Sequence, residues 1–210
     1  MNIRRILFVA LMMLGSIIDA PASPVTFDFT ATVDSIDSTL ASFFTMGETL
    51  TGSYTFESTT PGVLFGVSEF RYPALTAFSV SGSAFTGAWT GTDIFVQDSV
   101  PDLYLVQATA GFSGTNTGVG ITPPGAFLTL TDNTGSLLSS TLLPLTPPGL
   151  PNPGSRLNID YFLGLDIHAQ VLATLETLTL APRPAPEPMT LGLLGIALAG
   201  MRLSFRRAKR

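Results

Sequence analysis

Hydrophobic and polar side chains alternate with a period of two along much of the chain. From Val25 to Val33 every second residue is apolar, and Thr or Asp fills the positions between them. The same pattern returns at once in residues 49–57, where Leu50, Tyr54 and Phe56 share one face. This alternation predicts strands with one face toward a core and the other toward water.

Further short strands are predicted along the central part of the chain, with turn signals between them. The predicted strands are residues 75–81, 85–90, 93–97, 103–109, 126–131, 157–161 and 171–180, and the turn signals are residues 60–62, 81–83, 122–125 and 132–135. Residues 143–155 hold five Pro and two Gly, which predicts an extended loop across one end of the fold. Many short strands with regular turns predict an all-β, antiparallel β-sandwich or jelly-roll-like body, which we place at residues 23–181.

The N-terminus has the pattern of a signal peptide. Arg4 and Arg5 precede an apolar run over residues 6–18, and Ala20 and Ala22 form a small-x-small cleavage site around Pro21. The run is too short for the roughly 20 residues of a full membrane span. We therefore expect residues 1–22 to be a signal peptide helix, removed by the general secretion machinery.

The C-terminus has three features in order. A Pro-rich linker over residues 182–188 ends in Pro186, Glu187 and Pro188. The apolar run of residues 189–205 follows, and as a helix it reaches roughly 25 Å, which predicts a short transmembrane helix. The basic residues that complete the chain predict a cytoplasmic stop signal, with residues 206–210 as the tail, by the positive-inside rule. These residues are Arg202, Arg206, Arg207, Lys209 and Arg210.

This arrangement resembles the PEP-CTERM sorting domain of Gram-negative bacteria that make exopolysaccharide. The resemblance implies that Pro186, Glu187 and Pro188 form a motif recognised by exosortase, a membrane-embedded cysteine protease that removes the anchor. Residues 47–56, 72–78 and 142–144 also look like segments of exported proteins that carry this domain. For the body the resemblance implies an all-β exported domain, and it implies no biochemical mechanism.

Charge is distributed unevenly along the chain. Between residues 24 and 182 there are 13 Asp and Glu against Arg71 and Arg156, a net charge of −11 with no lysine. A surface of this sign repels phosphate backbones, so we expect no nucleic-acid partner. The chain has no Cys, which excludes disulfides, thiolate metal sites and a thiol nucleophile.

Candidate chemistry is sparse. His168 is the single histidine, so a site with several histidine ligands is impossible. We expect no cofactor, with one weak metal hypothesis: Asp93, Asp98 and Asp102, with Asp132, offer carboxylate oxygens of the kind that calcium takes. The alternative for these carboxylates is that they solvate turns.

Two further hypotheses concern sugars. Four aromatic side chains are candidates for stacking on sugar rings, although packing in the core is the more ordinary role for them. They are Tyr72, Trp89, Tyr104 and Tyr161. A glycosidase would need a pair of carboxylates, for which Glu48, Glu57 and Glu69 are candidates.

Together these patterns predict a non-enzymatic exported protein of the cell surface or the extracellular, exopolysaccharide-rich biofilm matrix. Before processing it would be anchored in the inner membrane with its body in the periplasm. Its expected partners are exosortase, the secretion machinery, the membrane and exopolysaccharide. The alternatives are a carbohydrate-binding module at the same location and, third, a secreted glycosidase.

Overall fold

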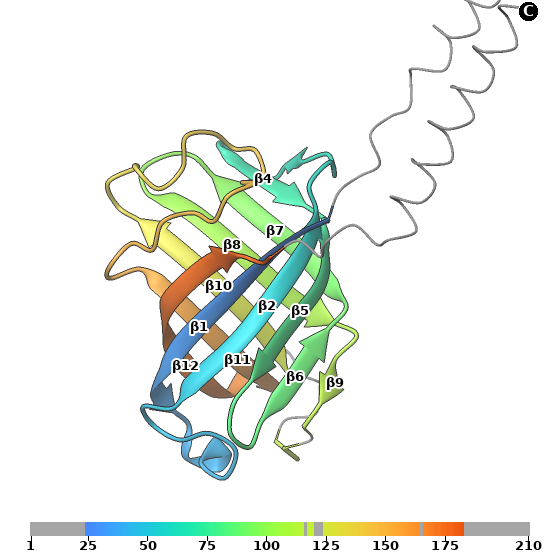
Figure 1. Ribbon diagram of the computed structural model, residues 1–210, viewed down its shortest axis with the longest axis vertical. Coiled ribbons are helices and arrows are strands. Elements are labelled where there is room, and N and C mark those ends of the chain that lie inside the picture. The colour runs from blue at the N-terminus through green and yellow to red at the C-terminus, as the bar shows by residue number, and fades with distance from the viewer. Residues whose placement is uncertain (1–23, 116, 120–123, 164–165, 183–210) are drawn as a thin grey trace, which may run out of the picture. The chain divides into compact units, whose positions relative to one another are not determined.

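The computed structural model describes residues 24–115, 117–119, 124–163 and 166–182, which form an all-β antiparallel body (Figure 1). Its elements, in chain order, are β1 (Pro24–Ile36), η1 (Ser38–Leu40), β2 (Thr49–Glu57), β3 (Val63–Leu64), β4 (Glu69–Tyr72), β5 (Leu75–Ser81), β6 (Thr86–Trp89), β7 (Gly91–Gln97), β8 (Asp102–Ala110), β9 (Ser113–Gly114), β10 (Gly125–Asp132), β11 (Ser155–Leu163) and β12 (Asp166–Leu180). The predicted fold class is confirmed at the level of an antiparallel, all-β domain.

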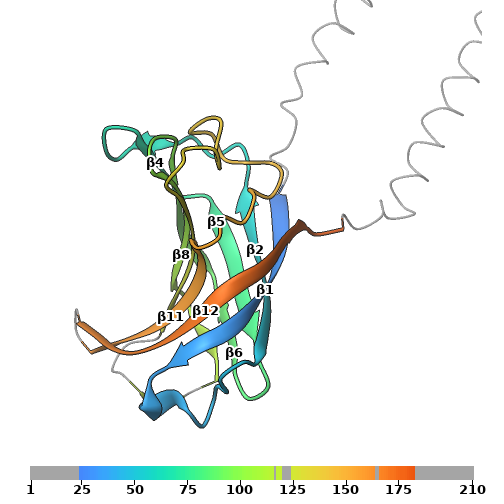
Figure 2. The ribbon, with the colours of Figure 1, turned by 90° about the vertical axis from the view of Figure 1, so that its left-hand side faces the viewer.

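The strands form one continuous sheet in the order β3-β4-β7-β8-β10-β11-β12-β1-β2-β5-β6-β9. The sheet curls so strongly that β5 contacts β7 and β8, which are far from it in this order (Figure 2). The sandwich expected from the sequence is thus replaced by a single sheet whose two arms face each other. Long central strands make this possible, because β1 and β12 bend at two register shifts without losing their pairing.

The core fills the concave side of the curled sheet. The odd positions of β1 from Val25 to Val33 are buried, as the alternation predicts. On the convex side, hydroxyl groups pair across neighbouring strands: Thr26 with Thr55 at 2.9 Å, and Ser53 with Ser79 at 3.1 Å between oxygen atoms. The Ser/Thr-rich outer positions therefore stabilise the sheet through cross-strand pairs.

Most of the predicted strands are confirmed, and two of them, residues 49–57 and 75–81, have the predicted bounds. The sequence reading missed β3, β4 and β9, which have two to four residues each and show too few alternations to be recognised. It also missed η1, whose first turn is capped by the side chain of Asp37. The predicted loop at residues 143–155 is confirmed as far as Gly154, and β11 begins at Ser155.

Loops close the two ends of the curled sheet. We call one of them the loop end: it comprises residues 58–68, 98–101 and 133–154, and β1 begins and β12 ends beside it (Figures 1 and 2). The opposite end carries η1 and the turn at Gly82. Within the described residues we find no helix with the length and apolar character that a membrane crossing requires. The predicted helices at residues 6–18 and 189–205 lie outside the described residues.

Candidate functional site

The terminal signals predicted from the sequence lie outside the described residues. This applies to Ala20 and Ala22, to Pro186, Glu187 and Pro188, and to Arg202, Arg206, Arg207, Lys209 and Arg210. The backbone of His168 lies in β12. The candidate residues of the body, in contrast, all have defined positions.

The calcium candidates are not gathered into one site. Among the described residues no group of three or more His, Asp or Glu side chains is placed to hold a metal ion. Asp93 on β7 instead forms an ion pair with Arg71 on β4, at 2.8 Å between Nη2 and Oδ2. This hydrogen bond raises the pKa of Arg71. Asp93 therefore joins two strands, and Asp98 lies half-buried in the loop that follows β7.

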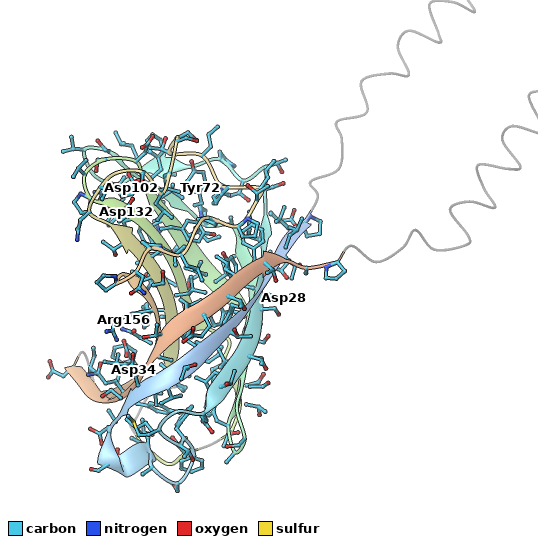
Figure 3. All side chains as sticks on the ribbon, turned by 60° about the vertical axis from the view of Figure 1, so that its left-hand side comes forward. Asp28, Asp34, Tyr72, Asp102, Asp132 and Arg156 are labelled. Carbon is cyan, nitrogen blue, oxygen red and sulfur yellow. The ribbon has the colours of Figure 1, made fainter. Side chains whose placement is uncertain are left out.

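Asp102 has a structural role at the end of the core. Its side chain is fully buried, and its two carboxylate oxygens accept hydrogen bonds from the backbone N–H groups of Ser99 and Leu138, each at 3.0 Å. The two donors belong to different loops, residues 98–101 and 133–154. Asp102 thus ties these loops together beneath the surface of the loop end (Figure 3).

Asp132 organises the turn that leads out of β10. Its carboxylate accepts hydrogen bonds from the backbone N–H and hydroxyl groups of both Thr134 and Ser136, at 2.8–2.9 Å. Four donors on one carboxylate favour its charged form, so the pKa of Asp132 is held far below its usual value. The turn-solvating role considered for these carboxylates is therefore the one observed here.

The four aromatic candidates for sugar stacking are core residues. Tyr72, Trp89, Tyr104 and Tyr161 are each at most 4 % exposed, so none of them offers an open ring face. Trp89 donates its indole N–H to the carbonyl of Pro124 at 2.7 Å, and Tyr72 donates its hydroxyl to the carbonyl of Thr141 at 2.6 Å. The core-packing interpretation is confirmed, and the stacking hypothesis is wrong for these residues.

Two of the three glycosidase candidates are far apart. Glu48 precedes β2 and Glu57 ends it, so the nine-residue strand places them at opposite ends of the sheet, about 30 Å apart. The two carboxylates of a glycosidase lie about 5 to 10 Å apart. Glu48 and Glu57 therefore cannot form such a pair, and Glu48 instead accepts a hydrogen bond from the Ser83 hydroxyl at 2.6 Å.

A feature missed by the sequence reading lies on the convex face of β11. The alternation places Asn158 and Asp160 on the polar face, yet Asp160 is only 6 % exposed, and Oδ1 of each side chain is buried with no hydrogen-bond partner among the described residues. Asp160 lies opposite Gly125 on β10, over which the Phe127 ring packs. Burial raises the pKa of Asp160 to about 6. The alternation gives no local signal of this burial, because it places both residues on the polar face.

The loop end is the most distinctive surface of the described body. A cleft of about 550 Å³ opens there between residues 58–62, the β4 side chains Phe70 and Tyr72, and residues 141–145. A second cleft of about 460 Å³ lies between the Asp132 turn and residues 149–153. The Pro-rich loop that the sequence predicts across one end of the fold lines part of both clefts.

No protein-family model matches the sequence, and searches of curated proteins and of solved structures return no match either. These comparisons therefore identify no family for the chain. What the structure establishes is an antiparallel all-β body with two long uncharged loops at one end.

Proposed function

We propose that this chain is an exported, non-enzymatic protein of the cell surface or extracellular matrix, sorted and processed at Pro186, Glu187 and Pro188. The observation that carries the proposal is the order of three features within the last 25 residues: the Pro-Glu-Pro motif, an apolar run and a basic terminus. Proline on both sides of Glu187 favours an extended, accessible segment ahead of the apolar run. Such a segment suits a membrane-embedded protease of the exosortase kind.

Carboxylates of the body support a structural role because they form contacts that hold strands and turns. Asp93, Asp102 and Asp132 join strands or hold turns, and Asp34 accepts hydrogen bonds from Arg156 at 3.4 Å and Thr174 at 2.7 Å. These carboxylates are thus engaged in holding the sheet and its loops. The net charge of −11 favours a well-hydrated, soluble surface in a polysaccharide matrix.

The test is the intact mass of the protein recovered from the matrix and membrane fractions of its native host. The wild type is compared with Glu187→Ala and with Glu176→Ala, a matched loss of one exposed carboxylate in β12. We expect the wild type and Glu176→Ala to lose the chain beyond the Pro-Glu-Pro region and to leave the membrane. Glu187→Ala should keep Arg210 and stay in the membrane.

Retention of Arg210 in all three proteins would refute processing at this motif.

The non-enzymatic part of the proposal is tested separately, by incubating the purified protein with the host's matrix polysaccharide. We expect no release of reducing sugar. Release that is lost in a Glu57→Gln or Glu69→Gln variant would assign a glycosidase activity instead.

A further inference from the structure

The two longest loops of the loop end carry no charge. Residues 58–68 and 133–154 contain no Asp, Glu, Lys or Arg, although the body around them has a net charge of −11. Carboxylates occur only where strands meet these loops, at Glu57, Glu69 and Asp132. The two loops therefore form an uncharged surface on an otherwise acidic body.

Large apolar side chains are exposed on the same loops. Of the ten large hydrophobic residues exposed within the described part of the chain, seven lie at the loop end: Val63, Leu64, Phe65, Val67, Val100, Leu142 and Leu145. Val67 is fully exposed, and Leu142 is 70 % exposed. We call these seven residues the apolar patch. Large exposed apolar side chains that gather at one end of a fold mark an interaction surface.

The apolar patch is continuous with the cleft of about 550 Å³. Leu142 and Leu145 line this cleft, and Val63 directly follows Gly62 in its wall. Val100 lies against the loop of residues 133–154, because a Cβ atom on Gly135 would approach Val100 to 2.9 Å. Loops that are far apart in the sequence thus share one apolar surface.

We propose that the apolar patch is a membrane-contact surface, which inserts shallowly into the bilayer that holds the chain's own C-terminal run. The inference rests on the proposed function, since it needs the predicted anchor at residues 189–205. The bilayer is the expected partner of the apolar patch because only a short segment joins the body to the predicted anchor. Leu180 pairs with Phe27 beside the loop end, and residues 181–188 span roughly 30 Å at most when fully extended. The end of the sheet that carries the patch is therefore the end at which the chain leaves for the predicted anchor.

The charges around the patch specify which lipid surface it fits. Glu57, Glu69 and Asp132 border the loop end, Asp98 lies within it, and Arg71 is paired with Asp93. An acidic border is repelled by anionic headgroups, whereas zwitterionic lipids carry no net charge and do not repel it. Insertion should thus be stronger in zwitterionic than in anionic bilayers, opposite to the usual behaviour of peripheral proteins with basic surfaces.

The chain has no Cys, which allows a clean test by site-specific labelling. Val67→Cys and the matched control Met46→Cys are labelled with a polarity-sensitive dye in the full chain, which is reconstituted into zwitterionic liposomes containing nitroxide lipids. Met46 is also apolar and exposed, but it lies near the opposite end of the sheet. We expect quenching and a blue shift at position 67 and neither at position 46. Quenching at both positions or at neither would overturn the inference.

Anchoring is measured in the same samples by flotation after an alkaline carbonate wash. A chain that floats without quenching at position 67 overturns the membrane-contact surface and leaves the proposed function intact. A chain that does not float but is quenched supports the surface and counts against the anchor. Loss of both signals overturns both.

Two variants refine the result. Phe65→Ser and Leu142→Ser each remove an exposed apolar side chain and should lower the ratio of inserted to free loop end about tenfold, which is the scale of burying such a side chain. The buried Trp89 reports by its emission that each variant is folded. A pyrene label at position 67 that forms excimers without lipid quenching would assign the patch to a second copy of this chain, and would overturn the proposal.

Discussion

Asp160 should make the protein more stable in mild acid than at neutral pH. Burial raises the pKa of this carboxyl from 3.8 to about 6, so the folded state holds the proton more tightly than the unfolded chain does. The stabilisation by the bound proton is complete below pH 3.8 and is lost as the pH rises through 6. A difference of about 2 pKa units corresponds to a loss of about 3 kcal/mol in the free energy of unfolding.

Asp160→Asn isolates this effect, because the amide resembles the protonated carboxyl and does not titrate. We expect the variant and the wild type to differ by a constant offset below pH 4. Above pH 7 the variant should gain about 3 kcal/mol relative to that offset, or roughly 6–12 °C in Tm for a body of this size. The change with pH is the informative quantity, since the offset also contains the cost of burying the amide.

Unfolding by urea is followed in the full chain in mild detergent through the emission of Trp89, which is the only tryptophan and is buried. The series covers pH 4 to 8. Asp166→Asn, at an exposed position of β12, controls for the loss of one negative charge from an acidic body. If the two variants show the same dependence on pH, burial of Asp160 is not its cause and the reasoning is refuted.

Other predictions concern single contacts, each measured by urea unfolding at pH 7. Asp102→Ala leaves two partly buried backbone N–H groups without acceptors and should cost about 2–3 kcal/mol; a loss below 1 kcal/mol would show that the loops are held in another way. Gly52→Ala should cost several kcal/mol, because its Cβ would lie 2.4 Å from the Phe29 ring, and an unchanged midpoint would contradict this packing. Tyr54→Phe should cost about 1–2 kcal/mol by leaving the Tyr104 hydroxyl unpaired, and the double Phe variant should regain part of it; a double variant as unstable as the sum of its single changes would argue against the pair.

Strand faces were predictable from the sequence because they depend on local alternation. Val25 to Val33 are buried at every second position, and the residues between them form hydroxyl pairs or face water. Pairing between strands depends on positions far apart in the sequence. The contact of β1 with β12 joins residues about 140 positions apart, and it makes the expected sandwich a single sheet. The alternation of apolar and polar residues does not indicate which distant strands will pair.

The same limit applies to the candidate residues. Asp102 and Asp160 both lie in alternating segments and look alike in the sequence, yet one is fully satisfied by two loop amides and the other has a buried oxygen without a partner. The difference arises from the surroundings of each side chain: loop amides face the Asp102 carboxylate, whereas Oδ1 of Asp160 is buried without a hydrogen-bond donor. Burial of a polar group is a tertiary property, so its energetic consequence could not be read from composition or spacing.

Charge adds a second level of organisation to the fold. The curled sheet requires only that apolar residues alternate along its strands. Acidic residues in the long loops would be compatible with this requirement. Residues 133–154 nevertheless remain uncharged over 22 positions, while their outermost leucines stay in solvent. Exposed apolar side chains on uncharged loops oppose solubility, so their retention at one end of an acidic body argues for a partner that is itself apolar. Under the proposed function, the linker of residues 182–188 leads from the loop end to such a partner, the bilayer of the predicted anchor.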